Sequence, residues 1–270
     1  MSGEGVLVPQ LGGVAGLVFD LEGTLYVGDR PVVGAAALIA TLRARGLPMR
    51  FLTNTTTCAH HALTVKLRRM GFDVLDEEVF CAPTAAGRYL RENDASAWLL
   101  VSPEALPDFE GVRLDPDNPD YVVVGDLGDD WTFELLNRAF VLVRERRARL
   151  IGLVRSRYWL SPDGARLDVG PFVVALEYAT GSTAKIFGKP ERAIFETVLG
   201  TMALPAGSVA MVGDDPVTDA AAAAVIGMRT VLVRTGKYRE GAEDPSESIS
   251  ADPCRADLVV DSVVDLIDSS

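Results

Sequence analysis

The stretch that decides the fold is FDLEGTLY, residues 19–26, which directly follows the apolar residues Leu17 and Val18. An apolar run bounded by aspartate and glycine is typical of a buried strand that ends in a turn. However, α/β sheets bind their ligands at the carboxyl ends of their strands, so Asp20 could also be a nucleophile or a metal ligand. Taken alone, the stretch favours the turn, and the rest of the chain must decide.

Along the rest of the chain, short β-rich runs alternate with helical periods. This alternation predicts an α/β fold with a Rossmann-like, doubly wound parallel sheet. Its predicted elements are helices at 34–45, 63–70, 190–200 and 219–226, and strands at 49–54, 185–188, 208–215 and 230–233. Pro190 is expected at the first position of its helix, a position that proline tolerates. The acidic stretch 240–256 is predicted to be an exposed loop.

A second alternating pattern interrupts the first between Pro83 and Ser182. Its predicted elements are helices at 84–92 and 131–147, strands at 97–101, 121–126 and 150–154, and a further element at 171–180. Turn-rich sequence marks both ends of this pattern, as expected at domain junctions. We therefore predict a core domain formed by 1–82 and 183–270, with 83–182 as an inserted, smaller α/β cap domain.

The composition indicates a globular chain and excludes several classes of protein. Of its 270 residues 48% are hydrophobic, and 38 acidic against 26 basic residues give a net charge of −12 without any basic block, so we expect no nucleic-acid partner. No apolar run reaches the roughly 18 residues of a membrane helix, and the N-terminus lacks the basic start of a secretory signal. Cys58, Cys81 and Cys254 are odd in number and far apart, which favours a reducing cytoplasm over disulfides or zinc.

Two common nucleotide-binding signatures are absent, and the two histidines carry no clear signal. The N-terminal glycines precede the first strand without the spacing of a dinucleotide site, and GKP at 188–190 lacks the Ser or Thr of a P-loop. His60 and His61 are adjacent, so on a helix they point about 100° apart. We expect both to be ordinary surface or helix-cap residues.

Three predicted strands end on chemically useful side chains. These are Asp20 with Glu22, Thr53 with Asn54, and Asp214 with Asp215. The carboxyl ends of parallel strands share one edge of a sheet, so these groups can converge on one pocket. Lys189 lies at a predicted helix start, where a cation is unfavourable unless an anion is near. Carboxylates, hydroxyl and amide donors and a lysine together indicate a phosphate site with Mg²⁺.

The ordered motifs FDLEGT, FLTN, GKP and VGDDPVTDA resemble those of the haloacid dehalogenase superfamily. This resemblance implies a Mg²⁺-dependent phosphatase that works through an aspartyl-phosphate. The insert between the second and third motifs is similar to the cap of the NagD-type subfamily. Further stretches, among them TNTT, GKPE and RTGKY, are similar to the branch that contains the phospholysine phosphohistidine inorganic pyrophosphate phosphatase.

The resemblance also implies roles for the residues that bind the phosphoryl group. Asp20 would be the nucleophile that attacks phosphorus. Thr53 and Asn54 would hold phosphoryl oxygens, and Lys189 would neutralise charge on the nucleophile and the phosphoryl group. The physical logic agrees, because a carboxylate cannot approach a phosphate dianion unless cations offset the repulsion.

By the same resemblance, Mg²⁺ would be bound by Asp20, the backbone carbonyl of Glu22 and the side chain of Asp214. Asp219 would orient a metal-bound water or the lysine from outside. The chain departs from the pattern at Glu22, because most phosphatases of the superfamily have aspartate there as the general acid. The efficiency of proton transfer to the leaving group is therefore open, whereas the covalent step is not affected.

The inserted domain is expected to select a small phosphorylated substrate and to exclude water. Arg155, Arg157 and Tyr158 precede a predicted loop at 161–171 and either read a second anionic group or form an ordinary solvated surface. The resemblance also implies that two chains can pair through their caps as a homodimer. A phosphotransferase with the same intermediate and a catalytically weak phosphoryl-binding protein remain the alternative functions.

Overall fold

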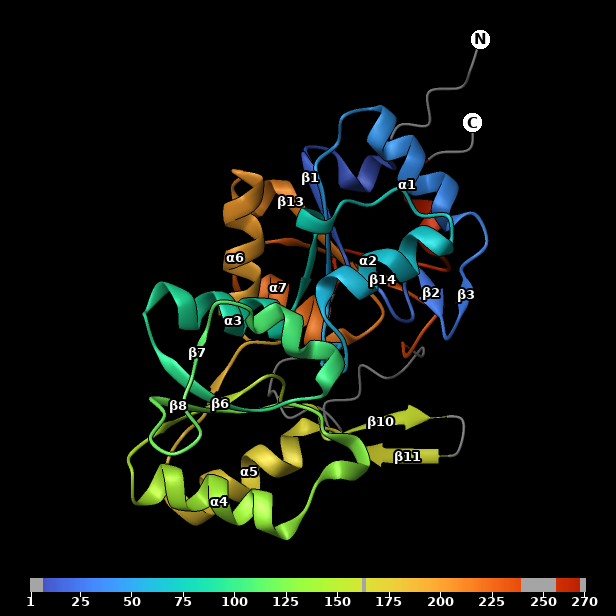
Figure 1. Cartoon of the computed structure of the whole chain (residues 1–270). Helices are drawn as coiled ribbons and strands as arrows, with labels where there is room; N and C mark the ends of the chain where they lie inside the picture. Colours follow the sequence, from blue (N-terminus) through green and yellow to red (C-terminus); the bar gives the residue numbers. More distant parts are fainter. Residues whose placement is uncertain (1–6, 162–163, 239–255, 268–270) are drawn as a thin grey trace. The chain divides into compact units, whose positions relative to one another are not determined.

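The computed structural model describes residues 7–161, 164–238 and 256–267, and it confirms the predicted α/β fold with a parallel core sheet (Figure 1). The chain forms two compact units. Within the described residues, the first unit consists of the chain up to Thr53, Leu63–Phe80 and the chain from Lys189 onward. The second unit consists of Asn54–Ala62 and Cys81–Gly188.

The first unit is built on a six-stranded sheet. In spatial order its strands are β15 (Leu258–Val260), β14 (Arg229–Val233), β13 (Val209–Gly213), β1 (Gly16–Phe19), β4 (Met49–Thr53) and β5 (Val79–Cys81). β1 pairs in parallel with both β13 and β4, and every residue of β1 and β13 is buried. The chain moves from β1 to one side of the sheet first and to the other side later, so the topological switch point lies between β1 and β13.

Helices cover both faces of this sheet, with α1 and α2 on one side and α6 and α7 on the other (Figure 1). The helices are α1 (Ala35–Ala44), α2 (His60–Arg69), α6 (Arg192–Met202) and α7 (Ala222–Val225). This cover explains why the central strands are continuous apolar runs rather than alternating patterns. Smaller elements complete the unit: the hairpin β2 (Tyr26–Val27) and β3 (Arg30–Pro31), and the helical turns Pro9–Leu11, Asp76–Glu78, Ala206–Ser208, Pro216–Ala221 and Val263–Leu266.

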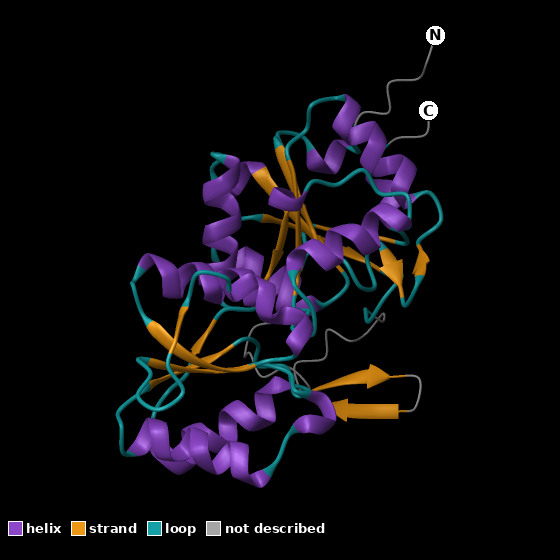
Figure 2. Cartoon of the chain, in the orientation of Figure 1, coloured by secondary structure: helices purple, strands orange, loops and turns teal. Residues whose placement is uncertain are grey.

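The second unit has a five-stranded, fully parallel sheet of its own (Figure 2). In spatial order its strands are β12 (Lys185–Ile186), β9 (Arg149–Gly152), β8 (Tyr121–Val124), β6 (Ser96–Leu100) and β7 (Arg113–Leu114). The helices are α3 (Ala82–Glu92), α4 (Phe133–Arg144) and α5 (Val169–Thr180), with helical turns at Pro103–Phe109 and Gly128–Asp130. α4 and α5 pack against each other and against β8.

The boundaries of the units differ from the predicted ones in three segments, of which 81–82 is the shortest and belongs to the second unit. The prediction assigned 183–188 to the core domain, but β12 pairs with β9 and so completes the second sheet. It also assigned 54–62 to the core domain, whereas hydrogen bonds fasten this segment to the turn Pro103–Phe109 of the second unit. Local sequence pattern does not show which sheet a short strand or loop joins, because that choice depends on distant partners.

Three local predictions differ from the structure in their bounds or their type. The helix predicted from Pro190 begins at Arg192, because the preceding Glu191 has extended backbone angles. The predicted alanine-rich helix at 219–226 is a π-helical turn, Pro216–Ala221, followed by α7. The predicted loop at 161–171 instead contributes to the hairpin of β10 (Tyr158–Ser161) and β11 (Gly164–Leu167) and to the start of α5.

The remaining sequence expectations are tested only in part. Residues 239–255, almost all of the acidic stretch expected to be an exposed loop, lie outside the described residues, as does Cys254. Among the described helices, none combines the length and the apolar character that crossing a bilayer requires.

Candidate active site

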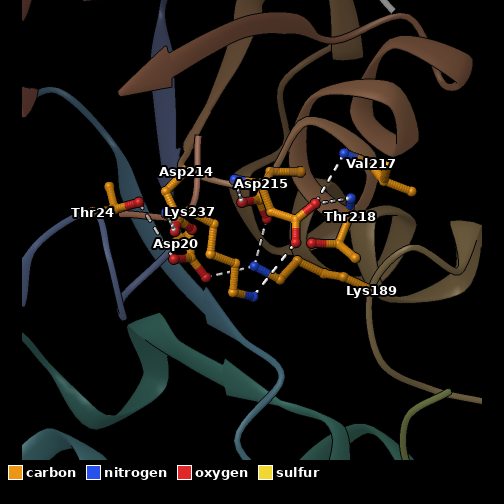
Figure 3. Close-up of polar contacts among 9 residues, drawn as sticks. Asp20, Thr24, Lys189, Asp214, Asp215, Val217, Thr218 and Lys237 are labelled. Atoms are coloured by element: carbon orange, nitrogen blue, oxygen red, sulfur yellow. Dashed lines mark hydrogen bonds and ion pairs between the residues drawn. The ribbon is translucent and has the colours of Figure 1, made fainter. Parts of the chain in front are cut away.

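Two aspartates come together because two neighbouring strands end side by side at the switch point. β1 and β13 are in register, with Phe19 opposite Val212, and Asp20 and Asp214 each follow the end of one strand. The backbone N–H of Asp20 donates to the carbonyl of Val212 at 2.8 Å, which extends the pairing by one residue. Both side chains are buried, with only 6% of Asp20 and 2% of Asp214 exposed. The carboxyl edge of the sheet therefore presents two carboxylates (Figure 3).

The ammonium group of Lys189 lies between two carboxylates of this cluster. Its Nζ atom is 2.5 Å from Asp20 Oδ1 and 2.6 Å from Asp219 Oδ1. All three side chains are buried. Asp219 reaches the site from the π-helical turn that follows β13. The lysine thus holds the predicted nucleophile and a residue from a separate element in one arrangement.

The cluster contains more negative charge than one ammonium can neutralise. Burial raises the pKa of Asp20 and of Asp214 above the ordinary range, and in each case a neighbouring aspartate raises it further. Burial also raises the pKa of Asp219 to about 6. Burial works against the charge of Lys189, but Asp20 and Asp219 outweigh it and raise the pKa of the lysine. The site therefore favours an additional cation.

The donor set fits a hard divalent cation. Asp20, Asp214 and Asp219 each offer one carboxylate oxygen, and these atoms all lie within 4.8 Å of one another. Oxygen ligands of this kind suit Mg²⁺ and Ca²⁺, and their excess charge would be offset by the ion. The prediction had named Glu22 through its backbone carbonyl as the third ligand, whereas the side-chain cluster includes Asp219.

The glycine and the threonine behind the first strand have specific structural roles. Gly23 has φ of 89°, and a Cβ atom there would overlap the carboxylate of Asp214. A Cβ atom on Gly236 would overlap the same carboxylate. Thr24 donates from Oγ1 to Asp20 Oδ2 at 3.3 Å, so it restrains the oxygen of Asp20 that does not contact Lys189. The predicted turn is therefore present, and it packs directly against the carboxylates of Asp20 and Asp214.

Asp215 has a different function from its neighbour in the sequence. Its Oδ1 atom accepts hydrogen bonds from the backbone N–H groups of Val217 at 2.9 Å and Thr218 at 3.0 Å. It therefore caps the π-helical turn that carries Asp219. Although burial opposes this, the Thr218 amide and the charge of Lys237 lower the pKa of Asp215. The hydrogen bonds to Asp215 thus compensate its charge, whereas the charge of the neighbouring cluster is not fully compensated.

Sequence reasoning missed Lys237 as a site residue. Its backbone N–H donates to Asp214 Oδ2 at 2.6 Å, and its exposed Nζ atom lies 3.4 Å from Asp215 Oδ2. Figure 3 shows this ammonium on the same side of Asp20 as that of Lys189. The stretch RTGKY, which contains Lys237, carries only a family likeness in the sequence. Lys237 therefore adds a second positive charge at the rim of the cluster.

The other predicted residues lie in different environments. Thr53 is buried at the end of β4, the neighbour of β1. The side chain of Glu22 is exposed, and its Oε1 atom accepts a hydrogen bond from the backbone N–H of Gly28 at 2.8 Å. Its carboxylate is thus bound to the loop of the β2–β3 hairpin. Asn54 belongs to the second unit, and its position there is described below.

The predicted cap residues are also placed by the structure. Arg155 forms two hydrogen bonds with the carboxylate of Glu177, at 3.0 and 2.7 Å, so its guanidinium already has an anionic partner. Arg157 and Tyr158 are exposed at the start of the β10–β11 hairpin. The interpretation of these residues as a reader of a second anionic group thus loses Arg155 as a ready donor.

The sequence was then compared with known proteins. A family model described as haloacid dehalogenase-like hydrolase matches residues 17–114, and a second, HAD-hydrolase-like model matches residues 186–266. The zebrafish (Danio rerio) phospholysine phosphohistidine inorganic pyrophosphate phosphatase is 38% identical over 262 residues, 95% of this chain and 94% of the relative. The chain belongs to the haloacid dehalogenase-like hydrolases. The family predicted from the four motifs is confirmed.

Further similarities place the chain among the NagD-type phosphatases of this family. The bovine haloacid dehalogenase-like hydrolase domain-containing protein 2 is 40% identical over 229 residues, 84% of this chain and 87% of the relative. The solved structure of a 4-nitrophenylphosphatase from Thermotoga maritima superposes with a TM-score of 0.83 at 27% identity, covering 94% of this chain and 96% of the other. The protein is therefore a phosphatase of the haloacid dehalogenase-like type.

Proposed function

We propose that the protein hydrolyses a small phosphorylated molecule, with Mg²⁺ as cofactor, through an aspartyl-phosphate on Asp20. The observation that supports this best is the buried arrangement of Asp20, Lys189, Asp214 and Asp219 at the switch point of the sheet. Phosphoryl transfer to a carboxylate requires a nucleophile, a fixed positive charge and carboxylates that can bind a metal ion.

In the first chemical step, an oxygen of Asp20 attacks phosphorus. The new bond joins this oxygen to phosphorus, and the bond between phosphorus and the leaving oxygen breaks. Lys189 stabilises the negative charge on the phosphoryl oxygens, and Thr24 keeps the other Asp20 oxygen in a fixed position. The leaving oxygen takes up a proton, either from water or from the carboxyl group of Glu22 if this group is protonated and leaves Gly28.

In the second step, water cleaves the acyl phosphate, releases inorganic phosphate and restores the Asp20 carboxylate. Asp219 accepts a hydrogen bond from Lys189, which keeps the ammonium directed at Asp20 in both steps. Asp20, Asp214 and the Glu22 carbonyl would hold Mg²⁺, which supplies the positive charge that lets a carboxylate approach a phosphate dianion.

The substrate class rests on the relatives. Their names include phospholysine, phosphohistidine, inorganic pyrophosphate and 4-nitrophenyl phosphate, all of which carry a terminal phosphoryl group. We therefore propose a small phosphorylated molecule and infer no individual metabolite. A phosphotransferase with the same intermediate and a homodimer formed through the second unit stay predictions.

One observation favours the alternative of a phosphoryl-binding protein with weak turnover. Glu22 stands at the position of the general acid. Its carboxylate accepts a hydrogen bond from the backbone N–H of Gly28, and no contact among the described residues directs it toward Asp20. Without a general acid, leaving groups of high pKa would depart slowly.

The experiment that tests the proposal is a rapid acid quench of the enzyme during turnover of 4-nitrophenyl phosphate with Mg²⁺. We expect mass spectrometry to find a phosphoryl adduct on the peptide that contains Asp20. A protein that releases 4-nitrophenol without forming this adduct would contradict the covalent mechanism. A protein that binds inorganic phosphate but shows no turnover would support the binding alternative, and transfer of the phosphoryl group to an added alcohol would support the phosphotransferase.

A further inference from the structure

A second buried carboxylate, Asp108, lies in the second unit and has no part in the chemistry described so far. Its side chain is 0% exposed. Oδ2 accepts hydrogen bonds from the backbone N–H of His60 at 3.1 Å, from Thr84 Oγ1 at 3.0 Å and from Cys81 Sγ at 3.3 Å. Oδ1 pairs with Nδ1 of the His60 ring. Asp108 thus joins the start of α2, the start of α3 and its own helical turn.

The electrostatics of this site indicate a permanent ion and not a reactive group. Burial opposes the charge of Asp108, but its bonds to the His60 ring and backbone lower its pKa. Burial and the neighbouring Asp108 raise the pKa of the Cys81 thiol, which therefore stays protonated and donates its hydrogen. A buried carboxylate with this many donors holds its partners in one geometry.

The segment that Asp108 holds through His60 is Asn54–Ala62. Two further hydrogen bonds fasten the same segment to the same helical turn. The backbone N–H of Ala59 donates to the Glu104 carbonyl at 2.9 Å, and the Ser102 hydroxyl donates to the Thr57 carbonyl at 2.9 Å. The segment is therefore positioned by the second unit, although it continues directly from β4 of the first.

The first residue of this segment is Asn54, which by the superfamily resemblance would hold a phosphoryl oxygen. Its Oδ1 atom is packed close to the backbone of Gly188, where an added Cβ would come within 2.8 Å of it. Gly188 in turn donates from its backbone N–H to the Leu153 carbonyl at 2.8 Å, so it is anchored to the strand region of the second sheet. Asn54 and the glycine it packs against thus both belong to the second unit.

We propose that Asp108 and His60 are positioning residues that fix the backbone of Asn54, and that turnover depends on this backbone. The inference rests on the proposed function. The pair touches neither substrate nor Asp20, and it acts by fixing the backbone from which the asparagine side chain extends. Since a misplacement of about 1 Å can cost on the order of 10²-fold in rate, a pair that fixes this backbone influences turnover from a distance.

The first test uses single substitutions of the pair, with steady-state hydrolysis of 4-nitrophenyl phosphate and inhibition by inorganic phosphate as readouts. We expect Asp108→Asn and His60→Ala to lower kcat/KM about tenfold and to weaken phosphate inhibition by a similar factor. His60→Asn should retain most of the activity, because its amide nitrogen can replace Nδ1 as the donor. The control Glu92→Gln, which removes an exposed ion pair on α3, should leave both readouts unchanged.

The second test is a double-mutant cycle with Asn54→Ala. If the pair acts through Asn54, adding Asp108→Asn or His60→Ala to the Asn54→Ala variant should change kcat/KM by less than about twofold, because the effects are not additive. Full additivity would overturn the inference, and so would wild-type kinetics in a folded Asp108→Asn variant.

The readouts separate this inference from the proposed function. If the wild type hydrolyses no phosphate ester and binds no phosphate, the proposed function fails and the inference fails with it. If the wild type is active but the cycle is additive, only the inference fails. Should Asp108→Asn not fold, the His60→Ala and His60→Asn variants decide the question by the same cycle, since His60 is only partly buried.

Discussion

The two units each bury carboxylates, and they treat them in opposite ways. In the second unit, Asp108 is surrounded by donors and its pKa is lowered. In the first unit, Asp20, Asp214 and Asp219 share one buried ammonium, and burial raises the pKa of all three. Folding a chain around uncompensated charge costs free energy, so such a cluster is expected where a bound cation or substrate supplies the missing charge.

The contrast teaches how to separate structural from functional buried acids. A carboxylate whose protein partners already satisfy it stabilises the fold, as Asp108 does. A carboxylate whose protein partners do not suffice binds something else. Asp215 supports this distinction within the first unit, because it caps a helical turn and its pKa is lowered although it is adjacent to Asp214.

The largest effect is expected at the nucleophile. Asp20→Asn keeps the shape of the side chain but cannot attack phosphorus, so kcat for 4-nitrophenyl phosphate should fall by more than about 1,000-fold, a barrier increase of roughly 4 kcal/mol. Asp215→Asn is the matched control, since asparagine also caps helices well. Its kcat should stay within about threefold of the wild type. Equal losses in the two variants would break the distinction between the two kinds of carboxylate.

Metal removal tests whether the excess charge of the first unit serves a cation. Activity should disappear in excess chelator and return with Mg²⁺, whereas Ca²⁺ should bind and inhibit, because its looser coordination misplaces the nucleophile. Thermal unfolding should shift upward on addition of either ion, because the ion binds the folded state. Full activity in the presence of chelator would contradict the proposed cofactor.

Substitution of Asp108 tests whether a buried carboxylate with hydrogen-bond donors around it stabilises the fold. Asp108→Asn should lower the free energy of unfolding by about 3 kcal/mol at pH 7, because it leaves the partners of a buried ion unmatched. The folded pKa lies below the ordinary value of 3.8, so the charge stabilises the fold above that value and the contribution is lost as the pH falls through the folded pKa. Denaturant titrations should therefore show the gap between the two proteins closing below about pH 4. A gap that is independent of pH would contradict this origin.

Glu22 tests the comparison at an exposed carboxylate that is bound to a backbone amide. Since its carboxylate is held by Gly28, we expect alkyl phosphates to react much more slowly than aryl phosphates. Glu22→Asp should improve the poor substrates by about tenfold while changing the good ones little. Single-turnover rates over a series of leaving groups would measure this, and a flat dependence in the wild type would show that Glu22 is already an effective acid.

The smallest effect should be a gain in stability. Asp214→Asn removes one of the mutually repelling charges, so in chelator it should raise the free energy of unfolding by about 1 kcal/mol, or the melting temperature by roughly 3 °C. The sign follows from its pKa, because a carboxyl with a raised folded pKa destabilises the folded state as the pH rises through it. Mg²⁺ should reverse the order of the two proteins in thermal unfolding. A loss of stability of Asp214→Asn in chelator would show that the charge of Asp214 stabilises the fold, as that of Asp108 is expected to do.

The sequence by itself was sufficient for the fold class, the family and the prediction that carboxylates meet at one edge of the core sheet. Apolar runs that end in Asp20 and Asp214 predict buried parallel strands, and neighbouring strand ends must share one edge of a sheet. These features depend on local periodicity and on chain order, which the sequence contains directly. The convergence of Asp20 and Asp214 could therefore be predicted before any distance was known.

Only the tertiary structure decided which partners each charged group has. It placed Asn54 and β12 with the second unit, turned the carboxylate of Glu22 to Gly28, and gave His60, expected to be an ordinary surface or cap residue, a buried partner in Asp108. Glu22 and Gly28 are 6 positions apart in the chain, and His60 and Asp108 are 48 positions apart. β12 pairs with β9, which is not its neighbour in the chain. Hydrogen bonding and burial between such distant groups are set by packing, and no local pattern records them.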